Sequence, residues 1–160
     1  MWRPRARSLQ LLSDWAVLIG AVALFASLFL TWSHQLPQSV LAVAGGSPAL
    51  RGVPSDPTAW QVYSIADVLL GLVAVALLVV SLAVRSRGAR VTVLVAGAVA
   101  LAFTLHALDS APTNGVLVLN PLAASPQYLH PGATAGGGET VALVALVLAF
   151  AGIVVGLLTE

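Results

Sequence analysis

The sequence contains no cysteine and no lysine, and only 8% of its 160 residues are charged. Without cysteine, a disulfide, a thiolate-held metal, an iron–sulfur cluster and a thiol nucleophile are all excluded. A soluble domain carries roughly a quarter charged residues. The low charge and a mean hydropathy of +0.97 therefore exclude a water-soluble enzyme and a nucleic-acid-binding protein.

The sequence contains four long apolar runs. They cover residues 15–33, 65–84, 91–108 and 140–158. A helix needs about 20 apolar residues to cross the hydrocarbon core of a bilayer, which is about 30 Å thick. The sequence predicts an all-α membrane protein with one domain over residues 1–160, built as an antiparallel bundle of four transmembrane helices. Ser13 and Asp14 suit the start of the first helix.

The arginines indicate an orientation in the membrane. Six of the seven precede the first run or lie in the connector 85–90, and with Asp14 and Glu160 they give that side a formal charge of +4. Only Arg51 lies on the other side, where four acidic residues bring the formal charge to −3. Basic residues in short loops stay cytoplasmic. We therefore expect cytoplasmic N- and C-termini in the plasma membrane of a bacterium, since the Arg-, Ala- and Val-rich composition is typical of GC-rich genomes.

Two outer loops, residues 34–64 and 109–139, follow from this topology. Each contains one short β-prone piece, at 40–43 and 116–119. If the two pieces pair, they form a small β-ribbon cap over the outer face. Irregular loops lying against the bundle are the alternative.

The predicted spans lack the residues that membrane chemistry needs. A transporter or proton pump holds ionisable groups near the bilayer midplane, and these runs place none there. Bis-histidine haem needs two facing histidines, whereas only His106 lies within a run. The sequence also has no glycine-rich phosphate loop and no nucleophile elbow. We therefore expect no catalytic residue, no metal site, no cofactor and no enzymatic activity.

A polar cluster at the outer boundary is the one candidate ligand-binding site. It consists of Asp67, His106, Asp109 and Arg51. His106 and Asp109 are spaced i, i+3 and share a helix face. Asp67 follows Ser64 at capping-box spacing, so helix capping is the alternative interpretation of this residue. Asp109 lies at the unfavourable negative end of its helix. We therefore expect Arg51 to contact Asp109 or Asp67 and to tie the first outer loop to the helices.

Gly152 and Gly156 are spaced four residues apart on the last run. Small residues at this spacing let two membrane helices approach closely. We expect this pair to serve packing within the chain, and a partner helix is the alternative.

Two segments resemble a known group of proteins. They are FLTW at 29–32 and AWQVYSIADVLL at 59–70. The combination resembles small uncharacterised four-helix integral membrane proteins of GC-rich bacteria. The resemblance implies a four-helix bundle and supplies no activity.

The leading functional hypothesis is a non-catalytic membrane protein, an accessory subunit or envelope scaffold that acts by helix and outer-loop association. Its partners would be the lipid bilayer and a membrane protein or further copies of itself. One alternative is an outer-leaflet lipid or small-ligand binding protein, or an enzyme, that uses the outer polar cluster. The other is an oligomeric channel.

Overall fold

The computed structural model describes residues 3–34, 55–62, 65–83, 86–111 and 133–159. Its elements are α1 (Arg3–Ser27), β1 (Ser33–His34), α3 (Ala59–Val62), α4 (Ala66–Leu82), α5 (Arg87–Asp109), β2 (Thr134–Ala135) and α6 (Gly137–Thr159). Most described residues are helical, so the all-α prediction is confirmed. Three helical segments are long and apolar enough to cross a membrane: Ser8–Ser27, Arg87–Asp109 and Gly137–Thr159. The fourth apolar helix, α4, has 17 residues.

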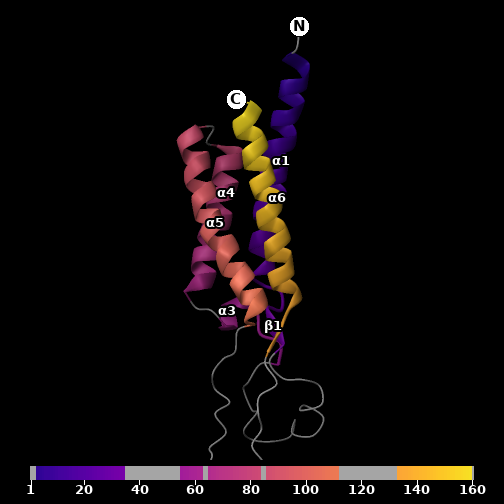
Figure 1. Ribbon diagram of the computed structural model, residues 1–160, viewed down its shortest axis with the longest axis vertical. Coiled ribbons are helices and arrows are strands. Elements are labelled where there is room, and N and C mark those ends of the chain that lie inside the picture. Colours follow the sequence, from indigo (N-terminus) through magenta and orange to yellow (C-terminus); the bar gives the residue numbers. More distant parts are fainter. Residues whose placement is uncertain (1–2, 35–54, 63–64, 84–85, 112–132, 160) are drawn as a thin grey trace, which may run out of the picture.

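The four long helices lie side by side (Figure 1). α1 packs against α4 and α6, and α5 packs against the same two helices. The start of α1, the end of α6 and the connection from α4 to α5 lie at one end of the molecule, here called the terminal end. α3, β1 and β2 lie at the other, here called the cap end.

Buried positions on each helix recur at alternating spacings of three and four residues. This seven-residue period keeps one stripe of a helix facing its neighbours, as in coiled coils. On α6 one buried row consists of small residues, and a second row of larger residues is buried beside it (Glu139, Leu146 and Ile153); the small residues are Gly138, Ala142, Ala145, Ala149, Gly152 and Gly156. On α5 it consists of Arg90, Val93, Gly97, Ala100, Thr104 and Ala107.

The most extensive helix contact is between α1 and α6. A methyl group on Gly20 would lie 2.7 Å from the carbonyl oxygen of Ala145, so α1 approaches the α6 backbone directly. The Ser13 hydroxyl donates a 2.7 Å hydrogen bond to the carbonyl oxygen of Gly152. Small residues permit this approach, and dispersion contacts and an interhelical hydrogen bond then stabilise the pair.

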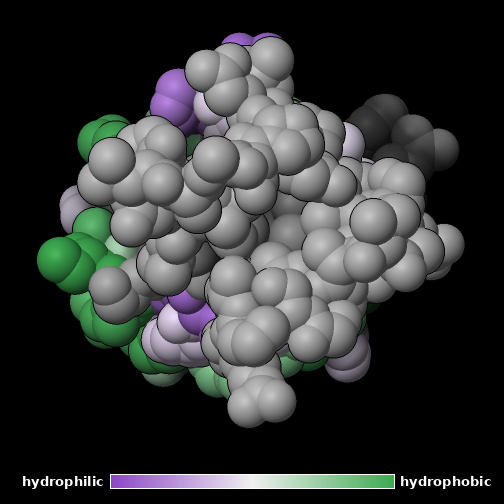
Figure 2. Space-filling model, turned by 90° about the horizontal axis from the view of Figure 1, so that it is seen from below, coloured by the Kyte–Doolittle hydropathy of each residue, from purple (hydrophilic) through white to green (hydrophobic). Residues whose placement is uncertain are grey.

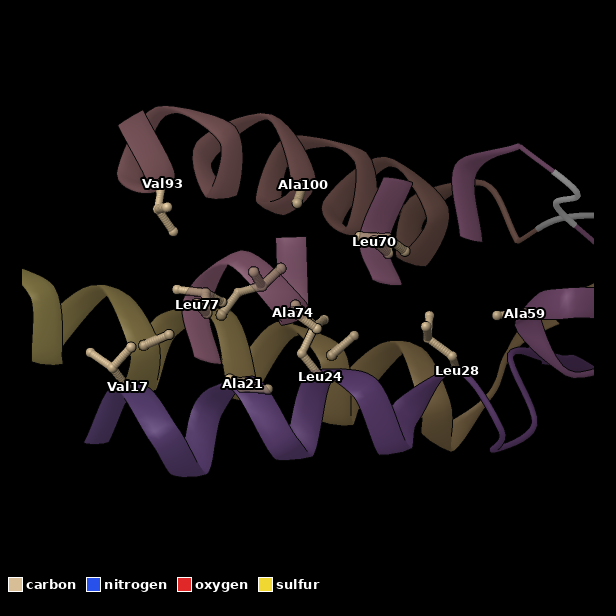
Figure 3. Packing of buried hydrophobic residues seen from close by; sticks show 14 of the residues in the cluster. Val17, Ala21, Leu24, Leu28, Ala59, Leu70, Ala74, Leu77, Val93 and Ala100 are labelled. Atoms are coloured by element: carbon tan, nitrogen blue, oxygen red, sulfur yellow. The ribbon is translucent and has the colours of Figure 1, made fainter. Parts of the chain in front are cut away.

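The core consists of successive layers along the long axis. Figure 3 shows Val17, Leu77 and Val93 toward one end, with Leu28 and Ala59 toward the other. These side chains are all at least nine-tenths buried.

Outward-facing positions are also apolar, for example Val99 on α5 and Val144 on α6, which are well exposed. Figure 2, viewed onto the cap end, shows hydrophobic surface emerging along its left and lower left edges. Apolar side chains on both the inner and outer faces are typical of helices that meet lipid.

The predicted bounds of the first helix are wrong at both ends. α1 begins at Arg3, so Ser13 and Asp14 lie within it, and it ends at Ser27. The chain beyond leaves the helix because the Trp32 N–H donates to Pro57 and the Gly136 N–H donates to Trp32. The sequence at 28–33 resembles a helix, but residues 28–30 form tight turns with local hydrogen bonds, and the backbone from Thr31 onward is paired with distant segments.

Candidate functional site

A small cap closes one end of the helices. It consists of residues 31–34, 55–58 and 133–136. β1 pairs antiparallel with β2, with Ser33 opposite Ala135 and His34 opposite Thr134. An isolated bridge joins Thr31 to Thr58. A short ribbon therefore links segments from both predicted outer loops, although at residues other than those expected. The pieces 40–43 and 116–119 lie outside the described residues.

One exposed side-chain hydrogen bond in the cap joins His34 to Asp56. The Nδ1 atom of His34 lies 2.5 Å from Oδ1 of Asp56. Hydrogen bonds donated by His34 and by the Ser55 hydroxyl lower the pKa of Asp56 below its ordinary value of 3.8. Asp56 is therefore charged at neutral pH. The pair connects the end of β1 to the segment that leads into α3.

Three buried polar side chains lie in or near the cap: Ser33 in β1, Asp67 in the first turn of α4 and Glu139 in the first turn of α6. All three residues have 0% exposure. The Ser33 hydroxyl and all four carboxyl oxygens have no hydrogen-bond partner within the described part of the chain. Buried polar groups in native proteins are nearly always satisfied, so each of these oxygens requires a partner.

The capping interpretation of Asp67 is wrong. The N-cap of α4 is Ile65, which makes no side-chain capping bond. Asp67 instead occupies the buried stripe of α4, together with Leu70, Ala74 and Leu77. Neither carboxyl oxygen of Asp67 accepts a hydrogen bond within the described residues, so this side chain does not cap the helix.

Glu139 also differs from its predicted place in the second outer loop. It lies in the first turn of α6 and is fully buried. The sequence does contain a signal for this position. Glu139, Leu146 and Ile153 are spaced seven residues apart, and all three are buried. If this heptad pattern is continued from Leu146 toward the N-terminus, it includes Glu139 and places it within the helix.

The predicted outer cluster is divided in the structure. Asp67 faces the interior, whereas His106 and Asp109 are exposed near the end of α5. Arg51, and with it the predicted contact to Asp109 or Asp67, lies outside the described residues. No group of three or more His, Cys, Asp or Glu side chains that could hold a metal occurs in the described segments.

A second buried polar group lies at the terminal end. Arg90, predicted to lie in the cytoplasmic connector, belongs to α5 and is 8% exposed. Its Nη2 atom lies 3.6 Å from Oδ1 of Asp14 on α1. Its guanidinium also packs against Gly156 in the last turns of α6. A cation is favourable at the negative end of a helix, so Arg90 fastens α1, α5 and α6 together.

Gly152 and Gly156 face α1 within the same chain. A methyl group on Gly152 would lie 2.8 Å from both the Ser13 carbonyl oxygen and Cγ2 of Val17. A methyl group on Gly156 would lie 2.7 Å from the Ser13 hydroxyl oxygen. These two glycines therefore serve the contact between α1 and α6.

An apolar groove runs between α4 and α5. Its volume is about 430 Å³, and all of its lining residues are apolar: Ala66, Leu69, Leu70, Leu72, Val73, Ala76, Ala96, Val99, Ala100 and Phe103. It opens onto the lipid-facing side, because Leu69, Leu72 and Val99 are exposed. The groove can hold a hydrocarbon chain or apolar side chains of another helix, and it offers no polar group for a reaction.

Comparison of the chain with protein-family models, curated proteins and solved structures found no match.

Proposed function

We propose that the chain is a four-span membrane protein of the bacterial plasma membrane, with cytoplasmic termini. α4 supports this proposal because it lies alongside α1 and α5 and extends from the cap end toward the terminal end (Figure 1). At about 1.5 Å per residue its 17 residues cover about 26 Å, within the lower range for a transmembrane helix. Four spans, arginines at the terminal end and the cap on the opposite side agree with the positive-inside rule.

Within that topology, the proposed function is that of a non-catalytic accessory subunit or envelope scaffold that acts by association. The observation that carries this proposal is the apolar groove between α4 and α5. Four alanines line it: Ala66, Ala76, Ala96 and Ala100. Small residues are enriched where membrane helices meet a partner helix. The small-residue stripe of α6 is already occupied by α1, whereas the groove between α4 and α5 is open to a partner.

A lipid-binding role is the second candidate function. The same groove supports it, since an outer-leaflet acyl chain also fills an apolar furrow that faces the bilayer. The oligomeric channel receives less support, because Gly152 and Gly156 are packed inside the chain and do not face another protomer.

Site-specific photo-crosslinking in native membranes distinguishes these functions. A photoreactive residue replaces Val99 at the groove, and a matched variant carries it at Val144, which is similarly exposed on α6. We expect the residue at position 99 to crosslink to one defined protein, either a partner or a second copy, and position 144 to crosslink to lipid. Lipid adducts at both positions would overturn the association proposal. Retention of one lipid species at position 99 through purification would favour the lipid-binding role.

A further inference from the structure

Three exposed aromatic residues form a continuous surface where α1 ends and α3 begins. This surface, here called the aromatic patch, consists of Phe25, Phe29 and Trp60. The rings of Phe25 and Phe29 meet edge to face, with their centroids 5.5 Å apart. The Phe29 ring also contacts the Trp60 indole, with the centroids 6.1 Å apart. The three residues are 43%, 58% and 41% exposed, and exposed apolar surface of this kind marks an interaction site.

The fold holds Trp60 beside the end of α1. A bridge between Thr31 and Thr58 joins the chain after α1 to the chain before α3. The Thr58 N–H donates a 3.1 Å hydrogen bond to Oε1 of Gln61, which stabilises the turn of α3 that carries Trp60. Ala59 is fully buried and belongs to the core (Figure 3). The next residue, Trp60, faces outward and covers Phe29.

The patch continues the apolar outer side of α1. Ile19 and Val22, which lie further from the cap on this helix, are both more than half exposed. The α1 segment that contains them is apolar enough to cross a membrane. Apolar side chains on the outside of such a helix meet lipid. The aromatic patch is therefore continuous with a lipid-facing surface.

The exposed surface changes character just beyond the patch. In the cap, His34 and Asp56 have side chains that are 51% and 53% exposed, and both are polar groups that require water. On the other side of the patch, the exposed residues of α1 include Val22 and Ile19. The transition from apolar to polar exposed side chains therefore occurs at the aromatic patch.

We propose that the aromatic patch binds the outer leaflet at the boundary between lipid headgroups and acyl chains. Tryptophan prefers this depth because its ring is apolar while its indole N–H is a hydrogen-bond donor. Phe25 and Phe29 lie among the upper acyl chains, and Trp60 lies at the headgroup level. The patch thereby sets the depth of the helices in the bilayer and holds α3 at the membrane surface. This inference rests on the proposed transmembrane topology, and it assigns lipid as the partner of this surface.

Tryptophan fluorescence in phosphatidylcholine vesicles measures the depth of Trp60. The lipids carry bromine, a contact quencher, either close to the headgroup or near the ends of the acyl chains. The difference in emission between the wild type and Trp60→Phe isolates Trp60, because the other tryptophans contribute to both. One of these, Trp32, is fully buried and donates its indole N–H to the Ser27 carbonyl oxygen. We expect bromines near the headgroup to remove more of the Trp60 emission than deep bromines.

Val22→Trp in the Trp60→Phe background is the matched control. Val22 is also exposed on α1 but lies further from the cap, so deep bromines should quench a tryptophan there more strongly. Three results for Trp60 would overturn the proposal: stronger quenching by deep bromines, quenching by aqueous acrylamide without any effect of bromine, or protection from all quenchers by a covering protein. If deep bromines also failed to quench the tryptophan at position 22, the transmembrane topology itself would be wrong.

Discussion

Gly152→Leu is expected to destabilise the protein by about 3 kcal/mol or more, because the added side chain cannot fit between α6 and α1. The first added carbon alone would lie 2.8 Å from the Ser13 carbonyl oxygen. Overpacking a close contact typically costs about 1–3 kcal/mol, and here the opposing atoms include backbone that cannot rotate away. The hydrogen bond from Ser13 to the Gly152 carbonyl would be lost as the helices separate.

The matched control is Ala151→Leu, one residue earlier on the exposed side of α6. Leucine is a better helix former than glycine by roughly 0.8 kcal/mol, so local helix propensity would favour the Gly152 variant. Reversible unfolding in mixed micelles, monitored by tryptophan fluorescence, measures the free energy of unfolding of both variants. Equal stabilities for the two variants would contradict the packing of Gly152 against α1.

Arg90→Leu should lower the free energy of unfolding by about 1–3 kcal/mol. The substitution removes the cation that lies between Asp14 and the end of α6. Breaking a fully buried ion pair costs about 3–5 kcal/mol, but the Asp14 side chain is 27% exposed and can be hydrated, so the expected loss is smaller.

Arg87→Leu provides the comparison, because Arg87 is exposed at the start of the same helix and carries the same charge. We expect it to change stability much less than Arg90→Leu. Asp14→Asn should lower the free energy of unfolding by more than Arg87→Leu and by less than Arg90→Leu. If the Arg87 variant were as destabilised as the Arg90 variant, net charge at the terminal end, and not the contact to Asp14, would determine stability.

The apolar runs predicted the helices because a helix that faces both core and lipid is apolar on all sides. The bounds were less predictable where a charged residue enters a helix. Asp14, Arg90 and Glu139 were each assigned outside a span, since an unpaired charge is costly in hydrocarbon. Asp14 and Arg90 lie within α1 and α5, where their side chains approach to 3.6 Å. Glu139 lies in α6 because it continues the buried heptad stripe.

The cap was the least predictable part of the fold. Its pairing joins Ser33 to Ala135 and Thr31 to Thr58, across long separations in sequence. Such short strands carry almost no local signal, so hydropathy alone extended the first helix to residue 33. The burial of Asp67 could not be predicted from the sequence for a related reason. Its spacing from Ser64 fits a capping box, and its burial becomes visible only once α1 and α5 are packed against α4.

In the proposed topology, four helices cross the membrane with the cap outside and the terminal end inside. Because the sequence has no cysteine, one introduced cysteine is a unique label. Suitable positions are Thr134 in β2 and Gly88 near the α4–α5 connection, both exposed. A membrane-impermeant maleimide should label Thr134→Cys in intact cells and Gly88→Cys only after permeabilisation. Labelling of both variants in intact cells, or of Gly88→Cys alone, would contradict this topology.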